Sequence, residues 1–180
     1  MLHIKTPDVE FFDERTQTFE NVKGCTLRLE HSLLSISKWE SKWKKPFLSN
    51  DEKTYQELID YIRCMTLNRN VDPKVYACIS QKNFDAIYEY IGSSHTATTF
   101  KDKLKRGPSG EIITSELIYY WMISCNIPFE CEKWNIDRLL TLVRICTIKS
   151  EKPKKMSRRE IMQRNRALNA SRKAKYHTRG

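Results

Sequence analysis

The chain has 180 residues, enough for one domain with an appendage, and its 39% hydrophobic content excludes disorder over most of its length. With only five glycines and six prolines, a loop-rich all-β protein is disfavoured and helices are favoured. Twelve of the 32 basic residues and two of the 22 acidic residues lie between Lys149 and Gly180, so this segment alone accounts for the net charge of +10. We therefore predict a neutral globular body, residues 1–148, and a cationic tail, residues 149–180.

The apolar runs and the cysteines indicate the compartment and the metal content. No apolar run reaches the roughly 18 residues of a membrane span, and no apolar signal segment follows Met1, so we expect a soluble protein of a reducing compartment. The six cysteines and four histidines lack the close paired spacing of metal ligands, which predicts no metal and no cofactor. Four cysteines lie inside apolar runs and are expected to be buried thiols: Cys64, Cys78, Cys125 and Cys146.

Residues 1–31 are predicted to form short strands. Thr, Phe, Val and Leu are frequent in residues 2–5, 11–13, 18–22 and 26–30, and turn-forming residues separate these segments. In the last segment, two leucines alternate with polar residues, which is typical of a strand with one buried face. We expect a small β-meander.

Residues 32–92 carry apolar residues at spacings of three and four, which predict helices. Each of these helices begins at a residue type that caps helix N-termini. Pro46 ends the first helix and Gly92 closes the last one. The predicted starts are Ser32, residues 49–52, Asp72 with Pro73 as the first helical residue, and Ser80.

Residues 93–148 are predicted to hold a loop and two further helices. The polar stretch 93–110 is longer than most connections and indicates a loop. Residues 111–126 are apolar almost all round, which predicts a central buried helix, and Asn135 is expected to cap the last helix of the body. Together these patterns predict a mainly α (α+β) chain with a body of five to six helices, a small N-terminal β-meander and a basic C-terminal helix.

The tail is predicted to hold a linker, residues 149–156, and a helix of about 15 residues. Ser157 and Glu160 have the spacing of a capping box, which predicts the start of this helix. Its few apolar residues make it marginal in isolation. Its cations are expected to bind either nucleic acid, without reading sequence, or an acidic protein surface. The arm residues are Lys154, Lys155, Arg158, Arg159, Arg164, Arg166, Arg172 and Lys173.

No catalytic motif is present in the sequence. Glycine-rich nucleotide-binding loops, HExxH and GxSxG are all absent. Glu130, Glu132 and Lys133 lie near one another, but three residues in one loop are weak evidence for the magnesium site of a nuclease. Other acid pairs fall at predicted turns or helix starts, where acids interact favourably with the helix dipole. We therefore predict no enzymatic activity and no catalytic residues.

The aromatic residues allow two interpretations. Trp39, Trp43 and Phe47 form either part of the core, which is the commoner case, or an exposed binding stripe. Residues 119–121 are three consecutive aromatics whose side chains point about 100° apart on a helix, so at least one must meet a second layer or a partner. The candidate partner-binding residues are Trp39, Trp43, Phe47, Tyr119, Tyr120, Trp121 and Trp134.

Several segments resemble a family of small proteins of long-tailed, siphovirus-type bacteriophages, the tail assembly chaperones. In the body these segments are TLRLEHS through WESKW (residues 26–43), EIITSELIYYW (111–121) and IPFECEKW through LLTL (127–142). In the tail the resemblance lies in PKKMSRRE through RALNA (153–170). It extends over most of residues 20–180.

The resemblance implies a non-enzymatic helical protein of the host cell cytoplasm that is absent from the mature virion. Such a protein binds the long, aggregation-prone tape measure protein, keeps it soluble and helps tail tube subunits polymerise around it, which makes the tail tube protein a second candidate partner. The resemblance assigns no active-site residue and no membrane contact. The charge pattern leaves one alternative open, a nucleic-acid-binding phage accessory protein that uses the basic C-terminal arm.

Overall fold

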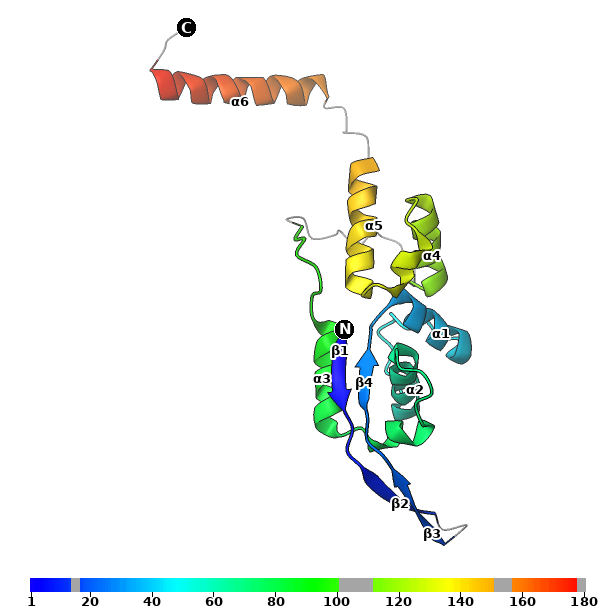
Figure 1. Ribbon diagram of the computed structural model, residues 1–180. Helices are drawn as coiled ribbons and strands as arrows, with labels where there is room; N and C mark the ends of the chain where they lie inside the picture. The colour runs from blue at the N-terminus through cyan, green and yellow to red at the C-terminus, as the bar shows by residue number, and fades with distance from the viewer. Residues whose placement is uncertain (14–16, 101–111, 151–156, 178–180) are drawn as a thin grey trace. The chain divides into compact units, whose positions relative to one another are not determined.

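The computed structural model describes residues 1–13, 17–100, 112–150 and 157–177. Contacts between residues divide the chain into two compact units, Met1–Thr147 and Ile148–Gly180. The predicted fold class is confirmed, because the chain is mainly helical, with short strands near the N-terminus and a helix near the C-terminus (Figure 1).

The four N-terminal strands form one interrupted β-ribbon. β1 pairs antiparallel with β4, and β2 pairs antiparallel with β3, so one hairpin is nested inside the other. This pairing differs from the predicted meander, in which each strand pairs with the next one along the chain. The strands are β1 (Leu2–Lys5), β2 (Val9–Asp13), β3 (Thr18–Val22) and β4 (Thr26–Leu29).

The ribbon is interrupted on both arms at opposite positions, between β1 and β2 and between β3 and β4. The Gly24 amide donates to Asp8 Oδ1 at 2.6 Å, and Thr6 exchanges hydrogen bonds with Cys25 through its own amide and hydroxyl. A Cβ on Gly24 would lie 2.2 Å from the carbonyl oxygen of Thr6, so only glycine permits this approach. The sequence indicates two separate turns at these positions. In the structure they lie opposite each other and form a single interruption of both arms of the ribbon.

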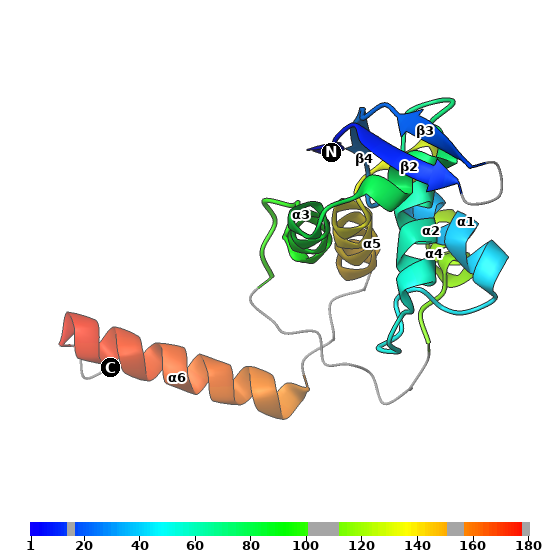
Figure 2. The same ribbon diagram turned by 90° about the horizontal axis from the view of Figure 1, so that it is seen from below.

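The core lies between the ribbon and the first helices. α1 packs on α2, α2 packs on β4, and α3 packs on β1. Figures 1 and 2 show α3 on the β1 side of the ribbon and α1 and α2 on the β4 side. Leu27 and Leu29 of β4 are fully buried, as their alternation predicts. The elements are α1 (Leu33–Trp43), α2 (Tyr55–Met65), η1 (Pro73–Cys78) and α3 (Gln81–Gly92).

Three helices begin where the sequence predicts, after the caps Ser32, Asp72 and Ser80. α2 begins later than the predicted start at residues 49–52. Its cap is Thr54, whose amide donates to Glu57 Oε2 at 2.7 Å while its hydroxyl oxygen accepts from the Glu57 amide at 3.3 Å. This reciprocal capping box satisfies two backbone N–H groups at the start of the helix. The polar residues 49–52 do not form such a box.

The rest of the body holds α4 (Ser115–Ser124), η2 (Phe129–Lys133) and α5 (Ile136–Ser150). Asn135 caps α5 as predicted, since its Oδ1 accepts from the amide of Asp137 at 3.0 Å. The amide of Ile136 donates to the carbonyl of His31 at 2.8 Å, which joins the start of α5 to the start of α1.

α4 is not the fully buried helix that the sequence predicts. Only Ser115, Ile118 and Met122 are buried, whereas Tyr120 and Ile123 are about 60% exposed. The main packing neighbour of α4 is α1, and a helix with one main neighbour buries one face. Because α4 is apolar almost all round, the side that does not pack on α1 is a hydrophobic face exposed to solvent.

The cysteines only partly follow the prediction. Cys78 is buried as expected, but Cys64, Cys125 and Cys146 are half-buried. Cys131 of η2 is buried, although the sequence places it in a loop. Among the residues that the structure describes, no group of three or more His, Cys, Asp or Glu is arranged to hold a metal ion.

Glu40 of α1 is a buried acid that joins three segments. Its carboxylate accepts the amide of Phe47 at 2.7 Å and the amide of Ser115 at 2.8 Å. Ser115 is the first residue of α4, so the charge lies at a helix N-terminus, where an anion is favoured. The carboxylate therefore holds the chain after α1 and the start of α4 against the same helix.

Glu57 is a second buried acid, at the start of α2. Lys45 donates to its Oε1 at 2.6 Å, and the Thr54 amide donates to its Oε2. These hydrogen bonds, that of Lys45 first, lower the pKa of Glu57 to about 2. The carbonyl of the same residue accepts the indole N–H of Trp39 at 2.8 Å. Glu57 therefore links α2 to α1 through its backbone, and to the segment that follows α1 through its side chain.

His31 lies in the core at the junction of β4 and α1. It is 4% exposed and shares a hydrogen bond with the hydroxyl of Tyr61. Its ring centroid lies 5.8 Å from that of Tyr61 and 6.2 Å from that of Phe47. Burial lowers the pKa of His31 to about 4, against the opposing effect of the Glu30 carboxylate. The imidazole is therefore neutral in the folded protein at neutral pH.

The body should be stable without the tail. A fragment of residues 1–148 should unfold cooperatively, with a thermal midpoint close to that of the full chain, because no residue of the C-terminal helix is buried. Circular dichroism of both chains measures this. A loss of more than about 2 kcal/mol on truncation would contradict it, since that exceeds a typical surface change.

The protein should lose stability as the pH falls from about 6.5 to about 4. His31 has a lower pKa folded than unfolded, so the unfolded chain binds the proton first, and the effect reaches the order of 3 kcal/mol. Urea unfolding of the His31→Gln variant should show a flatter pH dependence in this window. The exposed His3→Gln control should keep the dependence of the parent. Equal slopes for His31→Gln and the parent would refute this origin of the effect.

Candidate partner-binding surface

Two of the predicted partner-binding aromatics belong to the core. Trp39 is 1% exposed and Phe47 is 8% exposed. The ring of Phe47 stacks on that of Tyr61 with centroids 3.8 Å apart, and it meets the ring of Trp39 edge-on. A partner cannot reach these side chains without opening the fold, so the interpretation as core holds for both.

The other tryptophans lie at the margin of the fold. Trp43 is half-buried and stacks on Trp39, and its buried indole nitrogen has no hydrogen-bond partner within the described part of the chain. Trp121 is half-buried against the core. Trp134 is 39% exposed, and the guanidinium of Arg138 lies 4.9 Å from the centroid of its ring. Only Trp134 offers a large indole surface to solvent.

The consecutive aromatics of α4 divide between the core and solvent. At about 100° per residue, Tyr119 and Tyr120 lie on adjacent sides of the helix, and Ile123 projects between them. Tyr119 and Trp121 are half-buried, whereas Tyr120 is 62% exposed. Tyr120 is therefore the member of the run that neither packs in the core nor lies in a second layer.

η2 extends this exposed side of α4. The ring of Phe129, which is 56% exposed, lies with its centroid 6.3 Å from that of Tyr119. The hydroxyl of Tyr119 donates to Glu132 Oε2 at 2.8 Å, which fixes η2 against α4. Burial and then this hydrogen bond raise the pKa of Tyr119 to about 12, so it remains a neutral donor. We call Tyr119, Tyr120, Ile123 and Phe129 the aromatic face.

The charged residues of η2 differ in their contacts and exposure. Glu132 is engaged by Tyr119, while Glu130 and Lys133 are exposed on the short helix. With no metal-ligand group in residues 1–13, 17–100, 112–150 or 157–177, the described structure provides no support for a magnesium site here. The hydrogen bond from Tyr119 instead favours a structural role for Glu132, which orients the aromatic face.

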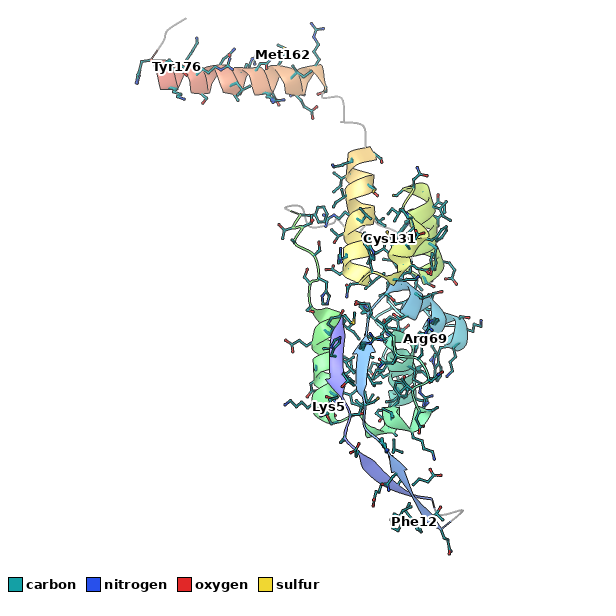
Figure 3. All side chains as sticks on the ribbon, viewed as in Figure 1. Lys5, Phe12, Arg69, Cys131, Met162 and Tyr176 are labelled. Atoms are coloured by element: carbon teal, nitrogen blue, oxygen red, sulfur yellow. The ribbon has the colours of Figure 1, made fainter. Side chains whose placement is uncertain are left out.

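A second exposed aromatic pair was missed by the sequence analysis. Phe12 of β2 and Phe19 of β3 are directly paired across the ribbon, with ring centroids 5.1 Å apart and exposed fractions of 52% and 71%. Figure 3 shows Phe12 at the far end of the ribbon. Phe11 and Phe12 are consecutive in a strand, so they must point to opposite faces. That pattern was the available signal that one of them lies outside.

The predicted anion-binding arm lies on α6 (Arg158–Tyr176). Ser157 and Glu160 form the predicted capping box, and every residue of the helix is exposed. Lys154 and Lys155 lie outside the described residues. Among the described helices, none is long and apolar enough to span a membrane. The arm residues placed on α6 are Arg158, Arg159, Arg164, Arg166, Arg172 and Lys173.

The aromatic face should contribute little to stability. Tyr120→Ala or Ile123→Ala should change the free energy of unfolding by about 0.5 kcal/mol or less, because both side chains are exposed. The control Ile118→Ala, on the buried side of the same helix, should cost about 2 to 5 kcal/mol. Urea unfolding measures all three. A loss near 2 kcal/mol for Tyr120→Ala would show that its ring is packed in the fold.

Comparison of the chain with family models, with curated proteins and with solved structures finds no match.

Proposed function

We propose that this chain is a bacteriophage tail assembly chaperone that binds the tape measure protein in the host cytoplasm, promotes tail tube assembly around it and is absent from the finished virion. The proposal includes the tail tube protein as a second partner and no catalytic activity. It is supported by the resemblance of residues 26–43, 111–121, 127–142 and 153–170 to that family. Two of these segments contain Tyr119, Tyr120 and Phe129 of the aromatic face.

The aromatic face is the single observation that carries the proposal. Tyr120 and Ile123 of α4 and Phe129 of η2 each expose more than half of their surface. Large apolar side chains that gather on one exposed face are typical of an interaction site. Partners that are helical and apolar dock through such stripes, and one buried aromatic anchor can dominate the affinity. A tape measure protein, as a long aggregation-prone chain, is a partner of that chemistry.

Co-expression with the tape measure protein of the same phage genome tests the proposal. The tape measure protein should move from the pellet to the soluble fraction and co-purify with this chain. A variant with Tyr120→Asp and Ile123→Asp should lose this activity, with binding weaker by about 30-fold or more, because a charge would replace each apolar anchor. Sedimentation and co-purification measure both effects.

Two controls locate the contact. Tyr88→Asp alters a 51% exposed aromatic on α3 and should leave solubilisation unchanged. Reversal of four tail charges, Arg158, Arg159, Arg164 and Arg166 to Glu, should also leave it unchanged if the aromatic face is the contact. A tape measure protein that stays insoluble, or that is soluble alone and forms no complex, would remove the basis of the proposal.

A further inference from the structure

α6 is a helix whose charge is almost entirely of one sign. Its single acid, Glu160, is engaged at the helix start, where its Oε2 accepts the Ser157 amide at 2.7 Å. Hydrogen bonds from Ser157 lower the pKa of this carboxyl. No residue of α6 is buried. The cations of the helix are Arg158, Arg159, Arg164, Arg166, Arg172, Lys173 and Lys175.

The cations occupy one side of the helix and flank a polar centre. At about 100° per residue, they fall within an arc of about 220°. Near the middle of this arc lie Arg158, Asn165, Asn169, Arg172 and, at the C-terminal end of the helix, Tyr176. One flank holds Arg159, Arg166 and Lys173, and the other holds Arg164 and Lys175.

The opposite side of α6 carries no cation. It consists of Glu160 and of small or neutral polar residues: Gln163, Ala167, Ala170, Ser171 and Ala174. The positive charge is therefore directional rather than spread evenly around the helix. This sidedness does not follow from net charge alone, and it indicates that one face of α6 meets an anionic surface.

We propose that α6 binds duplex DNA by lying in the major groove. Asn165, Asn169 and Arg172 would face the base edges, and the two cationic flanks would face the phosphates of the two strands. A helix of about 10–12 Å diameter fits the B-form major groove of about 12 Å width. Asn and Arg are the side chains that pair with adenine and guanine edges in this groove.

Other anionic partners fit this arrangement less well. A membrane-surface helix separates its apolar face from its cations, whereas Ile161 and Met162 lie within the cationic arc of α6. Single strands need several aromatic platforms, and Tyr176 is the one aromatic residue of α6. The major groove of A-form RNA is too deep and narrow for side chains to read. In Figure 3, Tyr176 is labelled at the C-terminal end of the helix and Met162 near its N-terminal end.

This inference is independent of the proposed chaperone function. The chaperone test depends on the aromatic face of α4, whereas DNA binding depends on α6. The failure of one experiment therefore leaves the other proposal unaffected.

Fluorescence anisotropy of the full chain with a labelled duplex of about 20 base pairs tests DNA binding. Binding at low salt should weaken as salt rises, with a slope of log K against log salt near −5, if five to six cations contact phosphates at about 0.9 each. An unlabelled single strand, and heparin at equal charge, should compete at least about 10-fold less well than the duplex. Absence of binding at low salt, or equal competition by these polyanions, would overturn the groove model.

Two variants matched in charge test which face binds. Arg158→Gln with Arg172→Gln and, on the opposite side, Gln163→Glu with Ala170→Glu each lower the net charge by two. The first pair should weaken binding by about 10-fold or more, whereas the second should change affinity by less than about 3-fold. Equal weakening by both pairs would show that the net charge of the tail attracts DNA and that no particular face of α6 binds it.

A third variant tests the central amides without changing charge. Asn165→Ala with Asn169→Ala should keep the salt slope but relax the preference among duplexes selected from a random pool at the positions that the two amides contact. Circular dichroism should show equal helicity for all variants. If the Arg158 and Arg172 pair loses helicity, Arg166→Gln with Lys173→Gln replaces it; because this pair lies on a flank that faces the phosphates, it should weaken binding and make the slope less steep by about 2. A selected preference that is unchanged by the loss of both amides would refute base contact by Asn165 and Asn169.

Discussion

The carboxylate of Glu40 is the interaction on which the arrangement of the body depends. A buried acid is costly unless hydrogen bonds replace its water, and here two backbone amides do so, from Phe47 and Ser115. One amide belongs to the chain that leaves α1 and the other begins α4. The same charge therefore fixes the path after α1 and places the first turn of α4 against that helix.

This placement decides which side of α4 is left outside. Once Ser115 is held at Glu40, Ile118 and Met122 face the core, and helical geometry turns Tyr120 and Ile123 away from it. η2 then adds Phe129, and the Tyr119–Glu132 hydrogen bond holds the two short elements together. The exposed aromatics are thus a consequence of core packing, and a partner that buried them would complete a side that the fold leaves uncovered.

The candidate site was only partly predictable from the sequence. Three consecutive aromatics on one helix cannot share one layer, so an exposed member at residues 119–121 was predictable, but not that it is Tyr120. For Trp39 and Phe47, closely spaced aromatic residues are the same pattern in a core and on a surface, and only their burial against Tyr61 and Glu57 decides between the two. Phe12 and Phe19 required knowledge of which strands pair, because their contact exists only across the ribbon.

The sequence by itself determined the features that depend on neighbours along the chain. These are the caps at Ser32, Ser80 and Ser157, the helical class and the confinement of net charge to the tail, since each involves residues a few positions apart or simple composition. Only the tertiary structure decided the nested pairing of the ribbon and the buried side of α4. Both depend on contacts between distant residues, such as Asp8 with Gly24 and Glu40 with Ser115, whose register no local pattern encodes.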